Sequence, residues 1–326
     1  MPDLTCYTTK LSPAQASELE TLLRQGAYEP RTVPYARVAA AARDLTVTLY
    51  ESGKLVVQGK GTTDFVQFEL EPKVLREARL GYEDVLDPSR LDARIGIDES
   101  GKGDFFGPLC IAGVYVNADV LAHWEGKGIR DSKAISSDAQ VARLARLIRE
   151  TPGCVHNVVA IGPEAYNRMY ARNQSVNRVL AWGHARVLEN LLGLQHRLSP
   201  PPVRAVSDQF AHDKSTVEQA LMQLGRKLEL VQRHKAESDP AVAAASILAR
   251  DEFVRRLHQL GETHGVTLPK GASPAAEAAG REFVARHGAD ALPRVAKMHF
   301  RNSYRVRGLP EPPRQEWKRP AKRPET

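Results

Sequence analysis

Short hydrophobic elements dominate the N-terminal part of the chain. Leu4–Lys10 suits a strand, and Ser12–Gln15 has the form of a capping box at the start of a helix. Apolar residues alternate with polar ones at 45–50, and a second strand pattern follows at 55–58 after a turn. This arrangement predicts a β-hairpin. Together these elements predict a small α+β unit over residues 1–72.

Longer elements begin at Arg94. The pattern predicts strands at 95–97, 109–116, 154–161 and 203–207 and an amphipathic helix at 176–191. Strands that alternate with helices indicate a mixed α/β sheet domain, which we place at residues 93–307. A linker of mixed charge at 73–92 precedes it, and a basic, proline-rich tail at 308–326 is expected to be disordered.

The composition is that of a globular protein, because 42% of the residues are hydrophobic and 26% are charged. No apolar run approaches the ~20 residues that cross a bilayer, and the N-terminus lacks the pattern of a secretory signal. The separate cysteines Cys6, Cys110 and Cys154 form no pattern typical of a disulfide framework or a zinc site. We therefore expect a cytoplasmic monomer with no membrane partner.

The net charge of +7 is unevenly distributed. Residues 1–92 hold 11 basic and 14 acidic residues, whereas the remainder holds 35 basic and 25 acidic residues. A basic excess suits a polyanionic partner, because phosphate contacts release counterions. Many basic proteins bind no nucleic acid, so the charge alone does not identify the partner.

The candidate chemistry centres on Asp98 and Glu99, which follow a buried strand and precede a loop of small residues. Side chains alternate along a strand, so the two carboxylates diverge unless the strand ends there. Acids at a strand end that faces a cleft suit Mg²⁺, which prefers carboxylate oxygens. For an isolated acidic pair, a solvated turn is the more ordinary interpretation.

A phosphate-binding P-loop is the first competing interpretation, because residues 96–102 spell G-x-x-x-x-G-K. That motif requires serine or threonine next, and Gly103 stands there instead. Asp98 and Glu99 would also place two negative charges inside a loop that binds phosphate. The P-loop interpretation fails on both counts.

The longer segment Asp98–Gly107 closely resembles the ribonuclease HIII signature DESGKGDFFGP. This match is far more specific than an acidic pair. The type II ribonuclease H superfamily also has an Asp-Ser-Lys motif, an acid at the end of a later strand and an acid before an alanine-rich helix. The segments that match here are Asp131-Ser132-Lys133, Ser207-Asp208 and Lys235-Ala236-Glu237-Ser238.

Two acids compete for the last place, Glu237 and Asp239. Asp239 precedes Pro240, and this pair suits a helix N-cap followed by proline at the first helical position. Asp239 thus has a structural role. The ribonuclease HIII pattern has glutamate at this place, so we assign Glu237 to the metal.

The resemblance implies an endoribonuclease that hydrolyses the RNA strand of RNA–DNA hybrids and leaves 5′-phosphate and 3′-hydroxyl ends. It implies a ribonuclease H-like mixed sheet flanked by helices, preceded by a small α+β domain like the TATA-box-binding protein. Asp98, Glu99, Asp208 and Glu237 would be the catalytic residues and would bind Mg²⁺ or Mn²⁺. Four converging carboxylates repel one another unless cations neutralise them. One ion would activate water and another would stabilise the leaving 3′-oxygen.

The same resemblance implies substrate contacts in three places. The candidate residues are Ser100, Gly101, Lys102, Gly103, Ser132, Lys133, Lys54, Gln58 and Lys60. The first four form the loop that would read the 2′-hydroxyl and phosphate of the RNA strand, and the next two would contact phosphate. The last three belong to the N-terminal unit, which would hold the hybrid. Lys297 and His299 also match the family pattern, but the sequence gives them no role.

Two alternatives remain. A ribonuclease HII-type enzyme shares the catalytic domain but also acts at single ribonucleotides in DNA; Glu237, Lys102 and the N-terminal unit argue against it. A hybrid-binding protein without catalysis belongs to another class, and the complete acidic set argues against it. Cleavage of a duplex with one embedded ribonucleotide tests the first alternative, and metal-dependent turnover tests the second.

Overall fold

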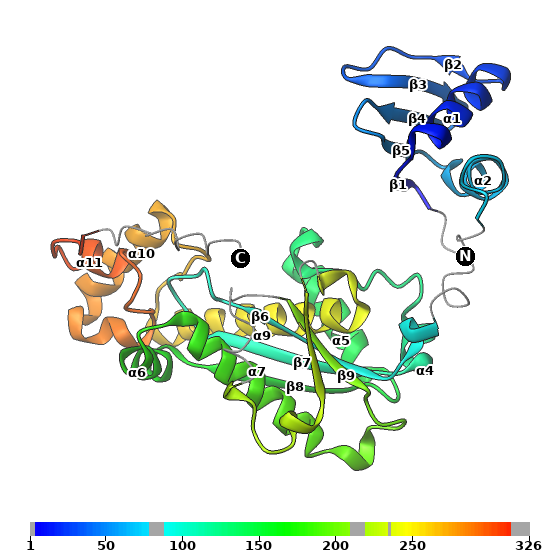
Figure 1. The fold of residues 1–326 in the computed structure, drawn as a ribbon. Coiled ribbons are helices and arrows are strands. Elements are labelled where there is room, and N and C mark those ends of the chain that lie inside the picture. The colour runs from blue at the N-terminus through cyan, green and yellow to red at the C-terminus, as the bar shows by residue number, and fades with distance from the viewer. Residues whose placement is uncertain (1–3, 78–87, 209–218, 234–235, 314–326) are drawn as a thin grey trace, which may run out of the picture. The chain divides into compact units, whose positions relative to one another are not determined.

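The computed structural model describes residues 4–77, 88–208, 219–233 and 236–313. The chain forms two compact units, Met1–Leu91 and Asp92–Thr326 (Figure 1). Residues 78–87 of the predicted linker and 314–326 of the predicted tail lie outside the described ranges. Within those ranges, no helix has both the length and the apolar character needed to cross a bilayer.

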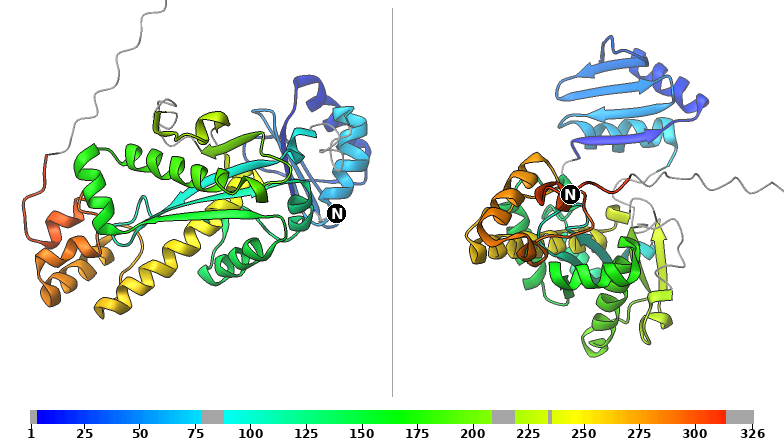
Figure 2. Two further views of the ribbon diagram at one scale, coloured as in Figure 1. Left: turned by 90° about the horizontal axis from the view of Figure 1, so that it is seen from below. Right: turned by 90° about the vertical axis from the view of Figure 1, so that its left-hand side faces the viewer.

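The first unit is a five-stranded antiparallel sheet with helices on one face (Figure 2). Its strands are β1 Cys6–Lys10, β2 Glu29–Pro30, β3 Ala36–Ala42, β4 Leu45–Tyr50 and β5 Lys54–Gln58, in the order β1-β5-β4-β3-β2. Its helices are α1 Pro13–Gln25, α2 Thr62–Phe65, the π-helix η1 Val66–Leu75 and the 3-10 turn η2 Pro88–Leu91. The α+β fold predicted for this unit is confirmed, and η1 continues past residue 72.

The predicted capping box starts α1. The Ser12 hydroxyl accepts a hydrogen bond from the Gln15 N–H at 3.3 Å, and the Gln15 side chain accepts one from the Ser12 N–H at 2.9 Å. Leu19 and Leu23 then pack against alternate residues of the central strands, such as Val47. The other strand residues point away from the helices, and they include Thr46, Lys54 and Gln58.

The second unit is a mixed five-stranded sheet flanked by helices, as predicted. Its strands are β6 Arg94–Ser100, β7 Leu109–Val116, β8 Val155–Ile161, β9 Arg204–Asp208 and β10 Glu229–Arg233, in the order β10-β9-β6-β7-β8. Strands β6, β9 and β10 run parallel, and β7 pairs antiparallel with β6 and β8. The α-helices are α4 Ala118–Trp124, α5 Asp138–Glu150, α6 Pro163–Asn173, α7 Val176–Leu192, α9 Pro240–His264, α10 Pro274–His287 and α11 Asn302–Val306. The 3-10 turns are η3 Ser132–Ala134, η4 Gln195–Arg197, η5 Gly225–Lys227, η6 Ala236–Ser238 and η7 Ala289–Arg294.

Glycines allow two helices to lie directly on this sheet, α9 on one face and α7 on the other (Figure 1). A Cβ atom at Gly96 would lie 2.1 Å from the carbonyl carbon of Ala241 in α9. A Cβ atom at Gly113 would lie 2.4 Å from a methyl group of Val187 in α7. Any side chain at these positions would force the helices away. At Gly96 the backbone of β6 therefore contacts α9 directly.

Candidate active site

Both carboxylates of the predicted acidic pair lie in β6. Asp98 pairs with Ala112 and Glu99 with Ile111 in the ladder with β7, so the strand continues to Ser100 instead of ending at the pair. The two side chains therefore point to opposite faces of the sheet, Asp98 toward α9 and Glu99 toward α7. The Glu99 N–H donates a hydrogen bond to Oδ1 of Asp98 at 2.9 Å.

Asp98 lies where a negative charge is unfavourable. Burial raises the pKa of Asp98 well above its usual range, and the charge of Glu99 raises it further. The hydrogen bond from the Glu99 N–H and the charge of Lys133 act in the opposite direction without outweighing burial. This carboxyl group therefore needs a proton or a cation to compensate its charge.

His184 in α7 holds the other carboxylate. Its Nε2 lies 3.1 Å from Oε2 of Glu99, and its side chain is 2% exposed. Burial by itself raises the pKa of Glu99, but the hydrogen bond and charge of this histidine, together with the charges of Lys102 and Lys133, lower it overall. His184 was not among the residues predicted from the sequence, although a histidine on the apolar face of the predicted helix at 176–191 was a signal.

Asp208 ends the neighbouring strand β9. Ser207 pairs with Ile97 in the parallel ladder of β6 and β9, so Asp208 follows at the level of the acidic pair. The backbone of Glu237 lies in η6, before α9, and its side chain is outside the described part of the chain. Among the side chains that are described, no three His, Cys, Asp or Glu residues form a group that could hold a metal ion. Convergence of all four acids stays a prediction.

Asp239 caps α9, as the sequence predicts. Its carboxylate accepts a hydrogen bond from the Ala241 N–H at 2.9 Å, and Pro240 occupies the start of the helix. Both carboxylate oxygens also accept from Nε of Arg94, at 3.0 and 2.9 Å. The side chains of Arg94 and Asp239 are 3% and 7% exposed, so this is a buried ion pair. Arg94 was not predicted from the sequence as the partner of Asp239.

The loop after β6 is buried at both ends and exposed at its tip. Ser100 is half-buried where the strand ends. Gly101 has a φ of +94°, and a Cβ atom there would lie 2.3 Å from the carbonyl oxygen of Pro108. Phe105–Phe106 is fully buried, whereas Lys102–Gly103 is exposed. The predicted substrate loop therefore presents Lys102 and Gly103 to solvent.

The predicted phosphate-binding turn at 131–133 is fixed to α9. The Ser132 N–H donates to the Ser246 hydroxyl at 2.9 Å, and Arg250 donates to the carbonyl of Ser132 in the turn and to the carbonyl of Ile135 just after it. Ser132 is buried, whereas Lys133 is exposed. The positive charge of Lys133 acts on the pKa of both carboxyls of the acidic pair, so the structure brings this lysine to the site.

The candidates of the N-terminal unit lie on or beside the helix-free face of the first sheet. Lys54 and Gln58 are exposed and alternate with buried residues of β5, and Lys60 is exposed just beyond the strand. Lys10 in β1 pairs directly with Lys54, and like charges at such positions repel unless an anion lies near them. Lys10 was not among the residues predicted to contact substrate, although the strand predicted at Leu4–Lys10 ends on it.

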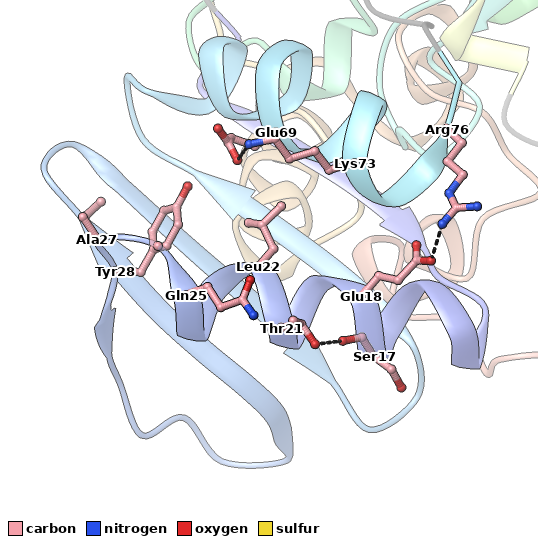
Figure 3. A pocket seen from close by; sticks show the side chains of 12 residues that line it. Ser17, Glu18, Thr21, Leu22, Gln25, Ala27, Tyr28, Glu69, Lys73 and Arg76 are labelled. Carbon is pink, nitrogen blue, oxygen red and sulfur yellow. Dashed lines mark hydrogen bonds and ion pairs between the residues drawn. The ribbon is translucent and has the colours of Figure 1, made fainter.

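A groove of about 870 Å³ lies on the other, helix-bearing side of the same unit, between α1 and η1 (Figure 3). Lys73 pairs with Glu69 at 2.7 Å, and Arg76 pairs with Glu18 at 2.8 Å. Carboxylates thus neutralise both basic side chains that line the groove. The groove is separate from the face that carries Lys54.

Known proteins resemble both units of the chain. The sequence matches the family Ribonuclease HII over residues 95–303 and a domain of unknown function, DUF3378, over residues 8–75. It is 41% identical over 301 residues to a ribonuclease HIII from Protochlamydia amoebophila, which covers 92% of this chain and 96% of that protein. A ribonuclease HIII from Chlamydia pneumoniae is 45% identical over 269 residues, or 80% of this chain and 85% of that protein. Among solved structures, Bst-RNase HIII in complex with Mn²⁺ matches with a TM-score of 0.65 and 27% identity, covering 93% of this chain and 98% of that one.

Proposed function

This chain belongs to the ribonuclease HII family, and we propose that it is an endoribonuclease that hydrolyses the RNA strand of RNA–DNA hybrids. Its relatives named ribonuclease HIII match nearly the whole chain, including the N-terminal unit that the Ribonuclease HII match does not reach. The half-buried acidic pair of Asp98 and Glu99, with His184 on one carboxylate, is the observation that carries the proposal. A cytoplasmic location and a monomeric state stay predictions of the sequence.

The acidic pair fits a divalent cation. Burial and the neighbouring Glu99 drive Asp98 toward taking up a proton, and a cation would compensate the same charge while the carboxylate stays ionised. Carboxylate oxygens suit Mg²⁺ and Mn²⁺, and the Mn²⁺ in the related structure supports this assignment. Together with Asp208 and Glu237, the pair would hold the ions. When bound, they supply Lewis acidity for the attacking water and the leaving oxygen.

Side chains around the pair prepare the site for a nucleic acid. His184 fixes one oxygen of Glu99 and favours its charged form. Lys102 and Lys133 add positive charge beside the acids, which lowers the repulsion that an approaching phosphate would meet. Gly103 has no atom within 4 Å of the place where a Cβ would stand, so a ligand can approach its backbone closely.

A cleavage assay tests this function. With Mg²⁺ or Mn²⁺, the protein is expected to cut an RNA–DNA hybrid inside the RNA strand, to leave 5′-phosphate and 3′-hydroxyl ends, and to spare double-stranded RNA. A chelator should stop the reaction. An absence of metal-dependent cleavage of the hybrid would contradict the proposal. A duplex with one embedded ribonucleotide completes the assay, because efficient cleavage there would favour the ribonuclease HII-type alternative.

We also propose that the helix-free face of the first sheet binds the phosphate backbone of the hybrid. Replacing Lys10 and Lys54 together by glutamine removes the two directly paired cations of this face. The slope of log affinity against log salt concentration is expected to become less steep by about 2. The KM for the hybrid is expected to rise with little change in kcat. Fluorescence anisotropy over a salt series measures the slope.

Lys73→Gln is the matched control for this pair. Lys73 lies on the helix-bearing side of the same unit and is neutralised by Glu69. Its replacement should leave the salt slope unchanged. If the double variant at Lys10 and Lys54 kept the wild-type slope, this face would not contact phosphate.

A further inference from the structure

Lys297 is completely buried beside the loop that follows β6. Its ammonium group donates hydrogen bonds to the carbonyl oxygens of Asp104, Phe106 and Gly107, at 2.8, 3.2 and 2.8 Å. A lysine ammonium has three N–H donors and no acceptor, so three carbonyls match it fully. The proposed chemistry gives this residue no part.

Burial of an ammonium group at this place is costly. Lys297 lies among apolar side chains such as Phe106 and Ala296, and its ammonium lies 5.9 Å from the ring centre of Tyr166. Burial lowers the pKa of Lys297 to about 7, against the opposing charge of Asp104. The three carbonyls offset the cost of burying this charge, so the ammonium and the loop backbone depend on each other.

The segment that carries Lys297 is itself firmly held. The Asn167 side chain in α6 donates to the carbonyls of Pro293 and Ala296, at 3.2 and 2.9 Å, and accepts from the Met298 N–H at 2.9 Å. The Lys297 N–H donates to the Phe105 carbonyl at 2.8 Å. Figure 1 shows α6, α10 and α11 gathered at the end of the sheet where β6 enters the loop. The ammonium is thus a fixed point for the loop.

The loop has little length in which to adjust. Its start is fixed at Gly101, which packs closely against Pro108 and Phe253. From Asp104 onward the backbone is held by Lys297, and Oδ1 of Asp104 accepts a hydrogen bond from the Gly271 N–H at 2.5 Å. The exposed tip, Lys102–Gly103, spans the gap between these two anchors.

We propose that Lys297 is a positioning residue for substrate recognition, because its ammonium holds the backbone of 104–107 so that the tip Lys102–Gly103 meets the RNA strand. This inference rests on the proposed function of the loop. Without the ammonium, three buried carbonyls lose their donor and the second anchor loosens. The tip then samples more positions, and ordering it on binding lowers the affinity for the hybrid. The loss falls on substrate binding, whereas the acids of β6 stay in place.

Lys297→Met tests the inference, because methionine has nearly the length of lysine and no donor. The KM for the hybrid is expected to rise about tenfold, with kcat changed less than about threefold. Lys297→Gln, which keeps one amide donor group, should lie between this variant and the wild type. Mn²⁺ affinity, measured by calorimetry without substrate, should not change. All assays run at a temperature at which circular dichroism shows every variant folded.

Trp124→Phe is the matched control. It removes a buried hydrogen bond, from Nε1 of Trp124 to the Thr151 hydroxyl at 2.9 Å, and Trp124 belongs to a different hydrophobic cluster from Phe105 and Phe106 of the loop. This control should lower stability and leave KM unchanged. An unchanged KM in Lys297→Met, or an equal rise in the control, would overturn the positioning role. A wild-type protein that fails to cut the hybrid would instead contradict the proposed function.

Discussion

Asp98→Asn is expected to lower the rate of hybrid cleavage by roughly 10⁴-fold while hybrid affinity stays unchanged. Asparagine keeps the shape of the carboxyl group but cannot supply the charge that a cation needs. The fold should tolerate the change well, because burial already disfavours the charge at this position. Single-turnover cleavage measures the rate, and fluorescence anisotropy in chelator measures binding of the hybrid.

Asp119→Asn is the control for this substitution. Asp119 is an exposed residue in the first turn of α4, and its replacement makes the same chemical change away from the acidic pair. Cleavage by this variant should match the wild type. If Asp98→Asn retained wild-type activity, the acidic pair would not be the catalytic centre.

Asp239→Ala is expected to lower the free energy of unfolding by about 3–5 kcal/mol, the largest loss of stability that we predict. The substitution leaves the guanidinium of Arg94 buried without its carboxylate and removes the cap of α9. Glu237→Gln should instead leave the unfolding free energy within about 1 kcal/mol of the wild type and abolish cleavage. Urea unfolding and a hybrid cleavage assay separate the two effects.

A repaired variant shows whether the ion pair accounts for the loss. Serine at position 239 still caps a helix, and methionine at position 94 removes the buried charge. The double variant Arg94→Met, Asp239→Ser should therefore recover most of the stability. The assignment of the two acids would be reversed if Glu237→Gln unfolded the protein while Asp239→Ala stayed stable and inactive.

Local chemistry made much of the second unit predictable. The run at 109–116 predicts β7 with its observed bounds, and the Asp-Pro step predicts the cap of α9. Prediction failed where residues are atypical for their element. Strand β3 is rich in alanine, which strands usually disfavour, and only pairing with β4 makes it a strand. In strand β10, the run of apolar residues is too short and too mixed with polar ones to predict a strand.

The support of the site could not be predicted, because it depends on contacts between distant parts of the chain. His184 and Glu99 are 85 residues apart, and Arg94 and Asp239 are 145 residues apart. Each residue alone has an ordinary role as a buried histidine or a strand arginine. Only the packing of α7 and α9 on opposite faces of one strand gives these side chains their partners.

Helix α9 sets the spacing of the whole face of the sheet on which it lies. Along its 25 residues it meets β6 at Gly96, the turn at 131–133 through Ser246, and the loop after β6 through Phe253 and Leu257. One residue inserted before Ser246 would rotate every later contact by about 100° and move it by about 1.5 Å along the axis. Strand, turn and loop would then lose their alignment together. The spacing along α9 between its contacts with the strand, the turn and the loop is therefore fixed. Insertions in this helix should be far less tolerated than substitutions.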